Sequence, residues 1–248
     1  MKRFIKKAFN LLGLEIRKTT FSNALKSQEK LINNPNSEIT ILDIGAYNGS
    51  TALQYAEAFP NATIHSFEPF PEAYLELVKN TEDKQNIRSH QLGLSSSVGT
   101  TTLYSNSFAP TNSLFKTHLE GENTWGNTNV LKPLGELEIN TITLDEFVKQ
   151  NQIDKIDILK LDVQGAEYMV LEGAHETLKK RKVGIVYTEI ITMPTYENQK
   201  SIEEIIAIYK SYGFELFNLY NYSRTNWGQL RQIDAIFVNP TIYKMNPK

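Results

Sequence analysis

The hydrophobic positions of this chain gather in short runs, and stretches with helical spacing separate the runs. In the first half the predicted strands are 39–45, 62–68, 87–94 and 99–104, and the predicted helices are 50–59 and 71–80. Pro71 suits the first position of its helix, because an N–H there would have no partner within the helix. This alternation is typical of a parallel sheet flanked by helices.

The second half of the chain repeats the alternation. The predicted strands are 138–142, 156–163, 183–190, 215–220 and 235–239, and the predicted helices are 143–150, 167–180 and 201–212. Thr143 and Glu146 have the spacing of a capping box at the start of the first of these helices. The whole pattern indicates one α/β domain with seven core strands.

Residues 105–135 lack this regularity and are predicted to form a long variable loop that selects the substrate. Phe108, Phe115, His118 and Trp125 in this loop either line a substrate pocket or anchor the loop to the domain.

The N-terminal residues 1–18 combine basic residues with hydrophobic residues at helical spacing, and Glu15 is their one acidic residue. Two interpretations remain open, a helix that packs on the domain or on a second subunit, and a basic helix on an anionic membrane surface. We therefore divide the chain into a helical segment, residues 1–30, and a catalytic domain, residues 31–248. We expect a cytoplasmic protein, with contact to the inner face of the membrane under the second interpretation.

The amino-acid composition excludes several classes of protein and of site. Hydrophobic residues make up 40% and charged residues 22% of the 248 positions, as in a globular domain. The net charge of −2 argues against a nucleic-acid partner. The absence of cysteine excludes disulfides, zinc–thiolate sites and cysteine nucleophiles. No paired-histidine zinc motif and no nucleophile-elbow serine occurs, so hydrolases of those two classes are not expected.

The first predicted strand runs into a glycine-containing turn, Asp43 to Gly49, where α/β proteins bind ligands. In a dinucleotide-binding turn, glycines would stand in place of Tyr47 and Ser50, so this turn lacks the glycines that let the backbone approach a pyrophosphate. A nicotinamide oxidoreductase is therefore a weaker alternative. S-adenosylmethionine (SAM) fits better, because it carries no phosphate.

A carboxylate at the end of the second strand completes this cofactor side. Glu68 lies 23 residues past Gly45, at the distance where an acid accepts both ribose hydroxyls. The residues predicted to contact SAM are Asp43, Gly45, Ala46, Tyr47, Gly49, Ser50, Glu68, Pro69, Phe70, Gly93, Leu94 and Asp162.

Two further carboxylates end neighbouring strands on the acceptor side. Asp162 follows the strand 156–163, and Glu189 lies near the end of the strand 183–190. Such a pair beside a methyl donor is suited to removing a proton from a hydroxyl, or to holding a divalent cation such as Mg²⁺. Asp162 is the first candidate base, Glu189 the second and His118 the third.

At these residues the sequence resembles the FkbM family of SAM-dependent methyltransferases. The matching segments are ILDIGAYNGS (41–50), FEPFPEAY (67–74), INTITLDEFV (139–148), IDILKLDVQGAEYMVLEGA (156–174), VYTEI (186–190) and DAIFVNP (234–240). The family usually has Glu at the position that Gln164 holds here.

The resemblance implies a class I methyltransferase fold, a doubly wound, Rossmann-like seven-stranded sheet of order 3-2-1-4-5-7-6 with the seventh strand antiparallel. It implies O-methylation, often of a sugar hydroxyl in a glycan, glycolipid or natural product, and gives the cofactor role to Asp43, Gly45, Gly49 and Glu68. A nucleic-acid methyltransferase and a SAM-binding protein without turnover remain alternatives. A homo-oligomer is open.

Overall fold

The computed structural model describes residues 23–126 and 128–243, so the basic segment 1–18 lies outside the described residues. The first described helix, α2 (Ala24–Ile32), crosses the expected boundary at residue 30, and its Ala24 and Ile32 join the hydrophobic core. Among the described residues, no helix is both long and apolar enough to cross a membrane.

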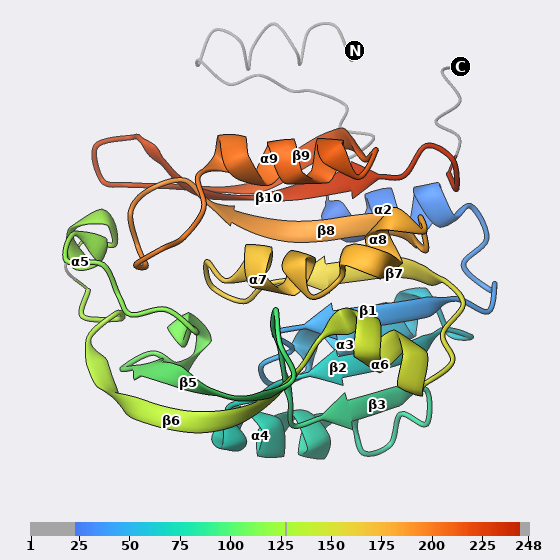
Figure 1. Ribbon diagram of the computed structural model, residues 1–248, viewed down its shortest axis with the longest axis horizontal. Helices are drawn as coiled ribbons and strands as arrows, with labels where there is room; N and C mark the ends of the chain where they lie inside the picture. The colour runs from blue at the N-terminus through green and yellow to red at the C-terminus, as the bar shows by residue number, and fades with distance from the viewer. Residues whose placement is uncertain (1–22, 127, 244–248) are drawn as a thin grey trace, which may run out of the picture.

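The main sheet has seven strands in the order β3-β2-β1-β7-β8-β10-β9 (Figure 1). The strands are β1 (Thr40–Ile44), β2 (Thr63–Phe67), β3 (Ile87–His90), β7 (Ile156–Leu161), β8 (Val183–Ile191), β9 (Glu215–Arg224) and β10 (Leu230–Val238). Strand β10 pairs antiparallel with both of its neighbours, and the other pairs are parallel. This is the class I methyltransferase order, with the last strand antiparallel, that the sequence predicts.

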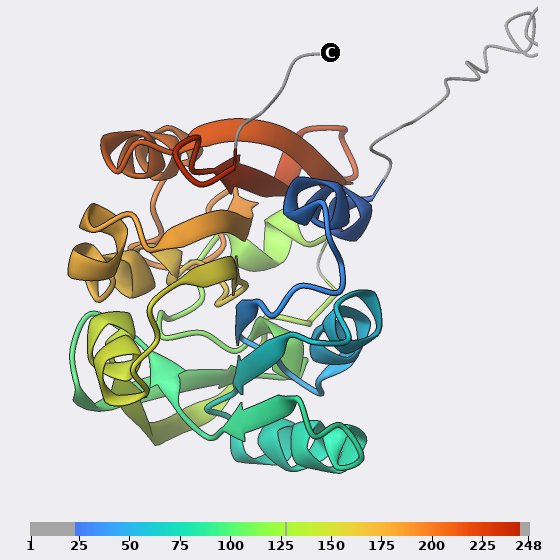
Figure 2. The same ribbon diagram turned by 90° about the vertical axis from the view of Figure 1, so that its right-hand side faces the viewer.

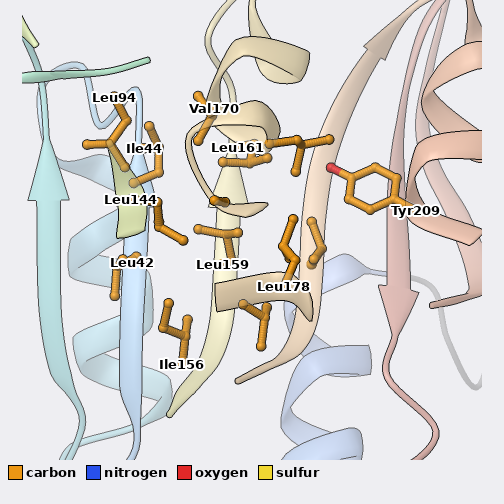
Figure 3. Packing of buried hydrophobic residues seen from close by; sticks show 14 of the residues in the cluster. Leu42, Ile44, Leu94, Leu144, Ile156, Leu159, Leu161, Val170, Leu178 and Tyr209 are labelled. Atoms are coloured by element: carbon orange, nitrogen blue, oxygen red, sulfur yellow. The ribbon is translucent and has the colours of Figure 1, made fainter. Parts of the chain in front are cut away.

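Helices cover both faces of the sheet, as Figure 2 shows. One face carries α2, α3 (Ser50–Ala58) and α4 (Pro71–Thr81), and the other carries α6 (Leu144–Gln150), α7 (Glu167–Glu172), α8 (His175–Lys179) and α9 (Ile202–Ser211). In β7, Leu159 and Leu161 point to the second face, and Val170 of α7 and Leu178 of α8 pack against that face (Figure 3). These strands are apolar on both faces because helices bury both.

The predicted strand 87–94 is wrong as one element. Strand β3 ends at His90, and after two intervening residues β4 (Gly93–Leu94) pairs with β6 (Pro133–Ile142) in a separate three-stranded sheet. The third member of that sheet is β5 (Gly99–Asn106). Only Ile87, Leu92 and Leu94 are apolar in this stretch, and β3 is only partly buried, so the pattern of residues does not reveal the change of sheet.

The predicted helix 167–180 is also interrupted. Gly173 lies so close to residue 95 that an added Cβ would come within 2.1 Å of the carbonyl oxygen of Ser95. The chain bends there into α8, and the carboxylate of Asp145 accepts the backbone N–H groups of Glu176 and Thr177 at 2.9 and 2.8 Å. A tertiary contact therefore divides a sequence with continuous helical spacing.

The segment 105–135 is less irregular than expected. Besides the ends of β5 and β6 it contains a short 3₁₀ helix, η1 (Ala109–Thr111), and one helical turn, α5 (Gly121–Thr124). Figure 1 shows β1 and β2 pointing toward the side of the molecule where α5 and the second sheet lie. The segment therefore covers the carboxyl ends of the parallel strands.

Two histidines on neighbouring strands, the buried His65 and the partly buried His90, form a pair that should make the fold sensitive to acid. His65 Nδ1 lies 3.1 Å from His90 Nε2, and both rings pack edge-on against Phe147. Burial lowers the pKa of His65 to about 4 and also lowers that of His90. The stability that the neutral rings contribute is complete above pH ~6.5 and is lost as the pH falls toward about 4.

We expect the melting temperature of the wild type to fall more between pH 7 and pH 4.5 than that of the double variant His65→Phe/His90→Phe. Thermal unfolding followed by circular dichroism measures both. The exposed His175 provides the control, since His175→Gln should behave as the wild type. Equal losses in wild type and double variant would contradict this role of the pair.

Candidate active site

The carboxyl ends of the central strands carry charged residues on one face of the sheet. In β1 and β7, Asp43 stands directly opposite Lys160 in the parallel register. Asp162 lies two residues beyond Lys160, and side chains two apart in an extended chain point the same way. The register of β7 with β8 brings Glu189 beside Asp162. Strand pairing alone therefore gathers these four side chains.

Asp43 and Lys160 form a buried ion pair below the site. The Lys160 ammonium lies 3.0 Å from Asp43 Oδ1 and donates to the backbone oxygen of Gly45 at 2.7 Å. The side chains of Asp43 and Lys160 are 0% and 6% exposed. Asp43 therefore supports the turn through Lys160, and it is not among the residues that line the cavity of the site.

Glu68 fastens the turn after β1 to the end of β2. Its Oε2 accepts the backbone N–H of Tyr47 at 2.8 Å, and its Oε1 accepts that of Phe70 at 2.9 Å. Burial raises the pKa of Glu68, and these two hydrogen bonds act against the rise. Each carboxylate oxygen keeps a free lone pair, so Glu68 still has capacity to accept two hydroxyl groups.

The two glycines of the turn serve close packing. A Cβ on Gly45 would lie 1.9 Å from the backbone oxygen of Asp162, and one on Gly49 would lie 2.8 Å from Leu77 Cδ1. Both residues have positive φ, +75° and +85°. Close packing and a positive φ therefore already require glycine at these two positions.

A single cavity of about 370 Å³ joins the cofactor side to the acceptor side. Of the residues predicted to contact SAM, those lining it are Gly45, Ala46, Tyr47, Ser50, Glu68, Pro69, Gly93, Leu94 and Asp162. The other three, Asp43, Gly49 and Phe70, are not among its lining residues. Its volume falls in the usual range of ligand pockets.

Asp162 and Glu189 both line this cavity, and a single amide group connects them. Gln164 Nε2 donates to Asp162 Oδ1 at 2.9 Å and to Glu189 Oε2 at 2.8 Å. The other Glu189 oxygen accepts from Gln232 at 2.7 Å. Burial, followed by the charge of Asp162, raises the pKa of Glu189 well above its ordinary value. The part of the chain that the structure describes contains no group of three or more His, Asp or Glu side chains placed to hold a metal ion.

Glu167 at the start of α7 holds the turn that carries Gln164. Its Oε1 accepts the backbone N–H groups of Val163 at 3.1 Å and Gly165 at 3.4 Å. Burial raises the pKa of Glu167 to about 7. We interpret its role as structural, because it does not line the cavity.

The third candidate base, His118, is not brought to this cavity. Its side-chain Nδ1 accepts the backbone N–H of Glu120, and its backbone N–H donates to the backbone oxygen of Thr195. The aromatic residues near it divide between the two expected roles. Phe108 and Trp125 line the cavity, whereas Phe115 stacks on Tyr168 and anchors the segment.

Three buried polar atoms in the lining residues have no hydrogen-bond partner in the described part of the chain. They are Asn112 Nδ2, Trp125 Nε1 and Gln232 Oε1. Arg231 lies over the ring of Trp125, with its Cζ 4.0 Å from the centroid. Such atoms are uncommon, because buried polar groups are almost always satisfied in native proteins.

Sequence reasoning missed Lys160 and Gln232, which also line the cavity. A signal for Lys160 was present, since a lysine inside the apolar run 156–163 must find a buried partner. Gln232 could not be found from the sequence, because the last strand was predicted to begin at residue 235, and Gln232 was therefore outside it. The strand begins at Leu230.

Comparison with known proteins agrees with this geometry. The profile described as Methyltransferase FkbM domain matches residues 43–216, which include the turn after β1, Glu68, Asp162 and Glu189. The chain belongs to the FkbM family of methyltransferases. Membership implies SAM as the cofactor of this FkbM methyltransferase.

Two relatives of this FkbM methyltransferase are named for their reactions. It is 28% identical over 206 residues to the 2-O-methyltransferase NoeI of Sinorhizobium fredii, covering 79% of this chain and 81% of that protein. It is 27% identical over 161 residues to the hexuronic acid methyltransferase AglP of Haloferax volcanii, covering 64% and 59%.

Among solved structures, the METTL16 methyltransferase domain is similar in fold, with a TM-score of 0.50 and 12% sequence identity. The match covers 87% of this chain and 66% of that chain.

Proposed function

We propose that this FkbM methyltransferase transfers the methyl group of SAM to a hydroxyl oxygen of a sugar in a glycan, glycolipid or natural product. The observation that carries the proposal is the shared cavity, which contains both the Glu68 turn and the Asp162–Glu189 pair. A cofactor held by the first and an acceptor held beside the second would lie next to each other.

The residues present fit a nucleoside cofactor. Glu68 has free lone pairs for the ribose hydroxyls, and Pro69 beside it offers an apolar surface to the adenine. The Lys160–Asp43 pair fixes the backbone of Gly45 under the cofactor side. When bound, SAM supplies an electrophilic methyl group on a sulfonium, with a neutral thioether as the leaving group.

The acceptor hydroxyl needs orientation and removal of its proton. Asp162 is 42% exposed and lines the cavity, so one of its oxygens can accept the proton of a hydroxyl placed there. Glu189 lies next to it and is held from both sides by amides of Gln164 and Gln232. The leaving group is good, so correct placement of the hydroxyl contributes much of the rate.

Two features favour a sugar as the acceptor. The cavity is lined by Asn112, Trp125 and Gln232, whose amides and indole are suited to hydrogen bonds with the hydroxyl groups of a sugar. Phe108, with 49% of its surface exposed, offers an apolar face to the C–H side of a sugar ring. The names of NoeI and AglP, a 2-O-methyltransferase and a hexuronic acid methyltransferase, agree with such an acceptor.

The proposal is tested by incubating the full chain with methyl-labelled SAM and a panel of neutral and acidic hexose glycosides. We expect label in at least one glycoside, with the methyl group on oxygen when the product is analysed by NMR. Trp125→Ala should raise the acceptor KM by about tenfold, since one hydrogen bond is worth ~1 kcal/mol and the ring contact is lost as well.

Trp227→Ala serves as the matched control, because this tryptophan is 59% exposed and does not line the cavity. Label appearing in tRNA and in no glycoside would contradict the proposal and favour a nucleic-acid methyltransferase. Tight binding of the cofactor product without transfer to any acceptor would favour a binding protein without turnover.

A further inference from the structure

The side-chain amide of Gln164 stands between the two carboxylates of the site. Its nitrogen has two N–H donors and uses one for Asp162, at 2.9 Å, and the other for Glu189, at 2.8 Å. The carboxylate oxygens have lone pairs only and cannot bond to each other while both are ionised. Gln164 is therefore the link between them.

The orientation of this amide is fixed from its other end. The Tyr196 hydroxyl lies 3.0 Å from Gln164 Oε1 and 2.8 Å from the backbone oxygen of Thr111, and these two acceptors share its one proton. Ser113 Oγ donates to the backbone oxygen of Gln164 at 2.7 Å. With its oxygen facing a donor, the amide presents its nitrogen to the carboxylates.

The backbone conformation also holds the side chain of Gln164 between the two carboxylates. Its φ is +54°, and that of the following Gly165 is +89°. A left-handed conformation is uncommon for a residue with a side chain and is found where a tight turn needs it. The turn points the side chain of Gln164 back across the ends of β7 and β8.

Among the described residues no ion pair joins one cation to both carboxylates. The Lys160 ammonium lies 3.8 Å from Asp162 Oδ2 but closer to Asp43 and to the backbone of Gly45. The charge of Arg231 acts on Glu189, but its guanidinium lies over the ring of Trp125. Two like charges brought together repel each other, and proteins relieve such pairs with a proton, a cation or shared donors. Here the two N–H groups of one amide are the donors that the pair shares.

We propose that Gln164 is a positioning residue that takes the place of a bridging cation, holding Asp162 and Glu189 at a fixed separation. Its role in methyl transfer rests on the proposed function, because the fixed carboxylates would orient the acceptor hydroxyl. The bridge itself is a property of the protein and can be measured without any acceptor.

Replacing the amide with an isosteric carboxylate should turn the bridge into a cation site. In Gln164→Glu three carboxylates meet where two carboxylates and two N–H donors met, and a hard divalent cation prefers such oxygen ligands. Gln164→Met removes the donors without adding charge. The double variant Gln164→Glu/Glu189→Gln has the same number of carboxylates as the wild type.

The experiment titrates Mn²⁺ into the full-length wild type and these three variants, by calorimetry and by thermal unfolding. We expect Mn²⁺ to raise the melting temperature of Gln164→Glu by about 3 °C or more at tenfold excess over its dissociation constant. The wild type, Gln164→Met and the double variant should show no shift. A merely structural role of Gln164 would give no Mn²⁺ rescue in Gln164→Glu.

Mn²⁺ binding by the wild type that is lost in Glu189→Gln would overturn the proposal, since a cation would then occupy the bridge. So would a folded Gln164→Glu that binds no Mn²⁺. If Gln164→Glu is unfolded alone, its refolding by Mn²⁺ and not by K⁺ supports the proposal, and failure to refold contradicts it. Calorimetry with S-adenosylhomocysteine on the same wild-type sample reports separately on the proposed function.

Discussion

The double variant Asp162→Asn/Glu189→Gln should lose methyl transfer by at least a thousandfold while it keeps its fold. A positioned base contributes typically ~10²–10⁴-fold to a rate, and both candidates are removed together because one could replace the other. Asn and Gln keep the shape of the two side chains and can still accept from Gln164. Rates of methyl transfer to an acceptor found in the glycoside panel measure the effect.

The single variants distinguish the two carboxylates. We expect Asp162→Asn to cost more than Glu189→Gln, because Asp162 is the more exposed to the cavity, whereas both Glu189 oxygens are already held by amides. Asp154→Asn/Glu203→Gln removes two exposed carboxylates elsewhere and should act as the wild type. Activity of the site double variant within tenfold of wild type would show that neither carboxylate is the base.

Glu68→Ala should weaken the binding of S-adenosylhomocysteine by about a hundredfold or more. Hydrogen bonds to a charged group are worth ~1.5–3 kcal/mol, and two ribose hydroxyls would lose such a partner. The substitution also removes the acceptor of the backbone N–H groups of Tyr47 and Phe70. The turn after β1 would then no longer be hydrogen-bonded to the end of β2. Calorimetry with the wild type and the variant side by side measures the change.

Glu72→Ala is the matched control, because Glu72 is an exposed acid in the first turn of α4, four residues away. It should bind as the wild type does, and melting temperatures of all three proteins separate a binding loss from unfolding. NAD is the second ligand, and we expect it not to bind. Unchanged binding of S-adenosylhomocysteine in Glu68→Ala, or binding of NAD to the wild type, would mean that the turn after β1 is misinterpreted.

The sequence by itself determined the main sheet and the edge of the sheet at which the proposed cofactor side lies. Seven short apolar runs alternating with helical stretches specify strands buried on both faces, and the order of the strands followed from the family resemblance that these runs carry. The turn after β1 and Glu68 lie at strand ends, and the carboxyl ends of parallel strands meet at one edge of the sheet. Local pattern and topology therefore suffice to bring Gly45, Glu68 and Asp162 to one cavity.

Tertiary structure decided the features that depend on contacts between distant segments. The division of residues 87–94 between two sheets follows from the pairing of β4 with β6, and the break at Gly173 follows from its contact with Ser95. Neither contact leaves a mark on the periodicity of the residues concerned. The structure of the segment 105–135 also depends on such contacts, so its sequence did not predict which of its residues reach the cavity. In the folded protein Trp125 lines the cavity and His118 does not.

The site shows the same distinction at the scale of single atoms. The sequence marks Gln164 as unusual for its family, but only the positive φ of its backbone and the hydroxyl of Tyr196 turn its amide nitrogen toward both carboxylates. Lys160 is buried beneath the turn because Asp43 lies opposite it on the neighbouring strand. Strand pattern fixes which residues reach the edge of the sheet, whereas hydrogen-bond geometry among segments far apart in the chain fixes what their side chains do there.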